Sequence, residues 1–137
     1  MGLKERRIAQ QFEQEQLPEL TEQINKAAGF EVEMEIKWET LVAEERFNHL
    51  LADSYPKVYF QPLIEAFTAI CADDMGKEAL QESLKKVLIV NENNHHNPTH
   101  AYSFSDGILK VDHSPIMNVD DVKSRTEKLN ELLENSL

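Results

Sequence analysis

The sequence has little cysteine, little glycine and no long apolar run. Its one cysteine, Cys71, excludes an intramolecular disulfide and fits a reducing compartment. Its four glycines form no phosphate-cradling loop. No stretch approaches the roughly 20 apolar residues that a membrane-spanning helix needs. We therefore expect neither a disulfide scaffold, nor a P-loop enzyme, nor a membrane protein.

Basic residues are also scarce. The chain of 137 residues has 14 Lys and Arg against 25 Asp and Glu, for a net charge of −11. The electric field of this negative charge repels a phosphate backbone, which argues against nucleic acid as a partner. The same charge favours a basic protein as a partner. Basic side chains within residues 1–7 have no apolar segment behind them, so we expect no secretory signal and a cytoplasmic protein.

The clearest pattern is the alternation across residues 30–38. Charged residues separate five apolar ones: Phe30, Val32, Met34, Ile36 and Trp38. Only an extended strand turns this order into one apolar face and one polar face. The sequence therefore predicts a strand here, with its apolar side chains on the core.

Two further stretches predict three more strands. The continuous apolar run 87–90 is typical of an interior strand. Asp106-Gly107 favours a two-residue turn, which predicts a hairpin over 100–113 in which Tyr102 faces Val111. In this register, His100 faces His113.

The rest of the chain has helical periodicity. We expect a helix over 3–28, broken near Pro18 and ended by Gly29, and a last helix over 119–135. Shorter helices are expected over 41–52, 62–71 and 77–86, with a connector or a first helical turn at 57–60 between two prolines. The prediction is one α+β domain over residues 1–137: a mainly antiparallel four-stranded sheet, with the N- and C-terminal helices and a central helical segment packed on one face.

Histidines suggest one candidate site. Four of the five lie in the predicted loop and hairpin: His95, His96, His100 and His113. Facing β-carbons lie about 4.5–5.5 Å apart, close enough for two imidazoles to hold a divalent metal such as zinc, with a loop histidine as a third ligand. Solvated loop histidines are the commoner alternative, and coupled titration of the facing pair is another.

The polar face of the first strand suggests a second site. Glu31, Glu33 and Glu35 point away from the predicted core, and Lys110 is expected to join them from the hairpin. Water screens the repulsion between these carboxylates, and a basic partner would relieve it. An ordinary solvated strand face is the alternative reading.

Motifs for catalysis are missing. No GxSxG elbow and no HExxH motif occur, and we expect Cys71 to be a buried small hydrophobe. A ligand pocket lined by Phe12, Met34, Trp38 and Phe67 is a further alternative, although such residues more often form core.

In size, acidity and expected helix-on-sheet layout, the chain resembles small acidic binding proteins such as bacterial immunity proteins and secretion chaperones. That resemblance implies a non-enzymatic protein-interaction module that binds a basic partner, as a monomer or a homodimer. The rival hypothesis is a metal- or small-ligand-binding protein that uses the histidine region.

Overall fold

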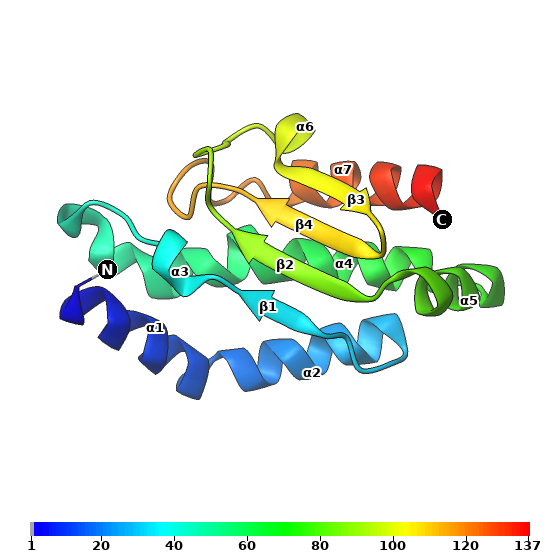
Figure 1. The fold of residues 1–137 in the computed structure, drawn as a ribbon, viewed down its shortest axis with the longest axis horizontal. Helices are drawn as coiled ribbons and strands as arrows, with labels where there is room; N and C mark the ends of the chain where they lie inside the picture. Colours follow the sequence, from blue (N-terminus) through cyan, green and yellow to red (C-terminus); the bar gives the residue numbers. More distant parts are fainter. Residues whose placement is uncertain (1) are drawn as a thin grey trace.

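The computed structural model describes residues 2–137 and consists of a four-stranded sheet with helices packed on one face (Figure 1). The α-helices are α1 (Leu3–Glu15), α2 (Leu17–Ala28), α3 (Leu51–Tyr55), α4 (Gln61–Ile70), α5 (Asp74–Ser83), α6 (Pro98–Ala101) and α7 (Val122–Ser136). The strands are β1 (Met34–Ile36), β2 (Lys86–Val90), β3 (Tyr102–Ser105) and β4 (Ile108–Asp112). Two 3₁₀ helices, η1 (Trp38–Thr40) and η2 (Glu45–Leu50), and a π-helix, η3 (Pro56–Phe60), complete the elements.

The predicted break in the N-terminal helix is confirmed. Pro18 lies in the first turn of α2, where its missing N–H costs no helical hydrogen bond, and Gln16 separates α1 from α2. Gly29 ends α2 in the left-handed conformation, with φ of 84°, and its N–H bonds to the carbonyl of Asn25. The chain then turns back toward the sheet.

The sheet is mixed, so the prediction of a mainly antiparallel sheet is wrong. The strand order is β1-β2-β4-β3; β1, β2 and β4 are parallel, and only the β3–β4 pair is antiparallel. The reason lies in the connection between β1 and β2, which passes through the helical segment from η1 to α5. A parallel pair needs such a long crossover.

The predicted hairpin register is confirmed for the four pairs from Tyr102 and Val111 to Ser105 and Ile108. Tyr102 pairs with Val111 and Phe104 with Leu109, around the turn that includes Gly107 at φ 81°. The hairpin is shorter than predicted, however. Residues 98–101 form the helical turn α6, whose first residue is Pro98. The expected pairing of His100 with His113 is therefore wrong, because position 100 lies in α6 and not in a strand.

The segment 30–38 is only partly a strand. Its ladder covers Met34–Ile36, and Trp38 already begins η1. The alternation of burial is nevertheless present: Val32 is buried, while Glu31 and Glu33 are exposed.

Of the two alternatives predicted for residues 57–60, the helical turn is present and the connector is wrong. Pro56 begins η3, which joins α3 to α4 without leaving helical geometry. Pro56 and Pro62 are tolerated because they lie in the first turns of η3 and α4, respectively.

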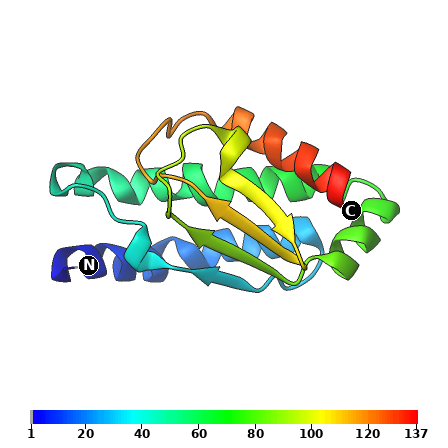
Figure 2. The ribbon, with the colours of Figure 1, turned by 45° about the horizontal axis from the view of Figure 1, so that its top comes forward.

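Helix α4 forms the centre of the core. It packs between α2 and α7, behind the sheet (Figure 2), and buries Leu63, Ala66 and Phe67 completely. Phe12 of α1 is also buried, with its ring 5.2 Å from that of Tyr55. Phe12 and Phe67 therefore belong to the core. Within residues 2–137, no helix combines the length and apolar character needed to cross a membrane.

Candidate functional site

One face of the sheet carries no helix. We call this the open face and define it by the residues that point away from the core: Glu35, Lys86, Leu88, Ser103, Ser105, Ile108 and Lys110. The register aligns one row across all four strands, from Glu35 through Leu88 and Lys110 to Ser103. Paired residues on neighbouring strands point to the same face. Figure 1 shows this face toward the viewer, with the helical layer behind it.

Ion pairs order the charges of the open face. The Glu35 carboxylate lies 2.8 Å from Lys86 Nζ and 3.8 Å from Lys37 Nζ. The hydrogen bond from Lys86 lowers the pKa of Glu35, and the same bond raises the pKa of Lys86. Lys110 pairs with Glu92, and their hydrogen bond raises the pKa of Lys110. The face is therefore charged and mixed in sign at neutral pH.

The predicted partner-binding residues do not form one uniform row. Glu35 and Lys110 lie two strands apart on the open face, as expected. Glu31 and Glu33 are exposed in the segment that leads into β1, outside the ladder. Among residues 2–137, neither of these two carboxylates has a basic side chain within 4.0 Å. They are thus the carboxylates of this surface that form no ion pair.

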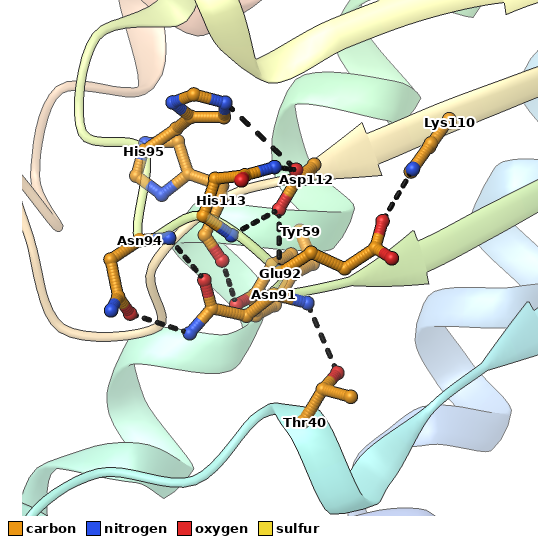
Figure 3. Close-up of polar contacts among 10 residues, drawn as sticks. Thr40, Tyr59, Asn91, Glu92, Asn94, His95, Lys110, Asp112 and His113 are labelled. Carbon is orange, nitrogen blue, oxygen red and sulfur yellow. Dashed lines mark hydrogen bonds and ion pairs between the residues drawn. The ribbon is translucent and has the colours of Figure 1, made fainter.

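The carboxyl ends of the three parallel strands lie at the same end of the sheet. There Asp112, the last residue of β4, holds the loop that follows β2 in place (Figure 3). Its carboxylate accepts hydrogen bonds from the N–H of Glu92 at 2.8 Å, and from the N–H and side-chain amide of Asn93 at 3.4 and 2.6 Å. Thr40 adds an acceptor for the N–H of Asn91 at 3.0 Å. Asp112 is only 6% exposed. Its place here is to satisfy backbone donors of the loop.

The four predicted metal ligands are not brought to one point. The rings of His95 and His100 are neighbours, with centroids 5.9 Å apart, and His95 Nε2 lies 3.9 Å from Asp112. His96 is exposed, whereas His113 is fully buried on the core side. Nowhere in residues 2–137 do three or more His, Cys, Asp and Glu side chains gather in a way that could hold a metal ion. Of the four histidines predicted to bind zinc, only His95 and His100 have neighbouring rings.

His113 belongs instead to a buried polar group behind β4. Its Nδ1–H donates to the carbonyl of Ser114 at 2.7 Å, and its own carbonyl accepts from the Tyr59 hydroxyl at 2.6 Å. Burial lowers the pKa of His113, and the positive charge of Arg125 lowers it further. The group therefore stabilises a neutral imidazole.

The sequence analysis did not single out Arg125, which is completely buried. Its guanidinium donates to the carbonyls of Asn118 at 2.8 Å and Lys57 at 3.3 Å, and also to that of Val119. Burial lowers the pKa of Arg125. A signal did exist in the sequence, since Arg125 lies one helical turn before Leu129 and so falls on the buried stripe of α7. Its contacts tie α7 and the preceding loop to η3.

Cys71 has none of the surroundings of a nucleophile. It is buried at the end of α4, and its thiol donates to the carbonyl of Ala28 at 3.6 Å. Burial raises the pKa of Cys71, which disfavours the reactive thiolate. The prediction that it fills space as a small hydrophobe is confirmed.

Comparison of the chain with models of protein families, with curated proteins and with solved structures found no match.

Proposed function

We propose that this protein is a non-enzymatic, immunity- or chaperone-like module that binds a basic protein through the open face and the adjoining carboxylates of Glu31 and Glu33. One observation carries the proposal: helices cover one face of the sheet only, and the bare face joins a charged row to a region of unpaired acidic charge. All-parallel sheets almost always have both faces covered, whereas this sheet, with three parallel strands, has one bare face. A bare face of this kind is a natural contact surface.

The chemistry of the face favours a protein over a small ligand. Leu88 and Ile108 are half-buried and lie beside lysine and glutamate side chains, which is the mixture of apolar centre and polar rim found in protein interfaces. The net charge of −11 speeds the approach of a basic partner and repels acidic ones.

Affinity capture from a lysate of the native cells at low salt tests this proposal. The test variant carries Glu31→Gln, Glu33→Gln and Glu35→Gln. The matched control carries Glu22→Gln, Glu127→Gln and Glu134→Gln, three exposed carboxylates on α2 and α7. Both variants change the net charge equally. We expect a basic partner to be retained by the wild type and the control and released by the test variant. Equal retention by both variants, or no captured partner, contradicts the proposal.

A further inference from the structure

Strand β1 forms a free edge of the sheet. It is the first strand in the order β1-β2-β4-β3, so β2 is its only neighbour among the described residues. The Glu33 carbonyl accepts from the N–H of Val87 at 2.9 Å, and the N–H of Lys37 donates to the Ile89 carbonyl at 3.0 Å. Backbone groups of alternate residues point to opposite sides of a strand, so those of Met34 and Ile36 point away from β2. An edge of this kind is a template for another strand.

A groove lies beside this edge. It has a volume of about 320 Å³, and its lining residues are Glu13, Leu17, Thr21, Val32, Met34, Ile36 and Trp38. Figure 1 shows α1 and α2 running alongside β1, on its side away from β2. The helices thus form a ledge, and the inward side chains of β1 form the adjoining wall. Five of its seven lining residues are apolar, and Glu13 and Thr21 add polar groups.

The ledge is suited to a strand. Leu17 and Thr21 lie four residues apart on α2 and therefore share one face, with Glu13 a further four residues before them on α1. A new strand would lie about 4.8 Å beyond β1. Every second side chain of that strand would point into the groove, toward Met34 and Ile36.

The rim of the groove carries one acidic side chain, Glu13, and Glu31 and Glu33 lie on the opposite face of the segment that leads into β1. All three are exposed, and within residues 2–137 no basic side chain lies within 4.0 Å of any of their carboxylates. On the open face, the remaining side chains of an added strand would lie beside Glu33 and Glu35. Opposite charges on adjacent strands stabilise pairing.

We propose that β1 accepts an extended segment of a protein partner as a fifth strand, in which apolar residues that enter the groove alternate with lysine or arginine residues that face Glu33 and Glu35. This inference rests on the proposed function and specifies the partner and its mode of binding. Main-chain hydrogen bonds to Met34 and Ile36 supply pairing, and the groove selects side chains. A second copy of β1 fits poorly, because it would place its own glutamates against these.

The test uses the whole protein and an end-blocked synthetic peptide of alternating lysine and valine. The control peptide has the same composition with the lysines and valines in two blocks. Amide hydrogen exchange at Met34 and Ile36 reports strand pairing directly, and the fluorescence of Trp38, the only tryptophan, reports entry into the groove. We expect the alternating peptide to slow exchange at both amides at least about tenfold, and the block peptide to leave it unchanged.

A pair of single variants tests the position. Glu13→Lys changes the rim, while Glu22→Lys makes the same charge change on an exposed position outside the groove. We expect Glu13→Lys to weaken peptide binding about three- to tenfold and Glu22→Lys to have little effect. Equal effects overturn the inference.

The remaining outcomes separate this inference from the proposed function. Peptide binding without slower exchange at Met34 and Ile36, or no binding at all, overturns strand addition, while capture of a basic partner through Glu31, Glu33 and Glu35 would still support the open face. Protection of the two amides that grows with protein concentration in the absence of peptide identifies a second copy as the occupant and overturns the basic partner.

Discussion

The Glu35 carboxylate and the Lys86 ammonium lie 2.8 Å apart, linking β1 to β2 on the open face. Both side chains keep contact with solvent, with Glu35 45% exposed and Lys86 27% exposed. Exposed ion pairs contribute little to stability. The pair therefore fixes the position of charge on the face more than it holds the sheet together.

Glu35→Gln should consequently leave the midpoint of urea unfolding almost unchanged, because the amide can still accept a hydrogen bond from Lys86. Binding of a basic partner should weaken, since the negative charge is lost. Urea titration and a binding isotherm on the same preparation measure the two effects. A large loss of stability would show that the pair is structural.

Asp112→Ala should destabilise the protein by about 2–3 kcal/mol, because the N–H groups of Glu92 and Asn93 lose a charged acceptor in a partly buried loop. Chemical unfolding measures the change. Asp74→Ala, at an exposed position of α5, is the control and should cost much less. Equal costs would mean that Asp112 does not organise the loop.

Arg125→Ala should cost about 3–5 kcal/mol, since three backbone carbonyls lose their donor and a large buried side chain is removed. Arg125→Lys should cost less than Arg125→Ala but remain destabilising, because an ammonium lacks the planar fork that reaches separate carbonyls. Urea unfolding ranks the two variants. Lys123→Ala, an exposed change on the same helix, should be nearly neutral.

Stability should fall as the pH drops below about 6.5, the unperturbed pKa of histidine. Burial and the neighbouring charges of Arg125, His95 and His96 lower the pKa of His113 in the folded state. The unfolded chain therefore takes up a proton first, and the loss continues until the pH reaches the lowered folded pKa. The slope from one such group is at most about 1.4 kcal/mol per pH unit.

His113→Gln should flatten this pH dependence between pH 6.5 and lower values, and His49→Gln, at an exposed position, should not. Unfolding free energies measured over a pH series give the slopes directly. An unaltered slope in His113→Gln would show that other groups cause the acid sensitivity.

Local signals in the sequence predicted local structure well. Pro18 and Gly29 marked the break and the end of the N-terminal helices, and Asp106-Gly107 gave the register of Tyr102 opposite Val111. Each of these features depends on a few neighbouring residues, so periodicity and turn chemistry suffice to predict them.

Long-range features were harder to predict. Periodicity does not state which strands are neighbours, although the apolar run 87–90 is typical of parallel strands and was a usable sign. Residues 57–60 were predicted as a connector or a first turn because proline often interrupts helices, whereas tertiary packing keeps η3 helical between α3 and α4. His113 was expected to face His100, and its burial against Tyr59 depends instead on a contact with a residue 54 positions away.

The most direct test of the open face as a binding surface is an NMR amide map of the protein titrated with its captured basic partner. We predict that the perturbed amides cluster at residues 31–36 and around Leu88 and Lys110. Perturbations confined to α4 and α7, on the helical side of the sheet, would contradict it.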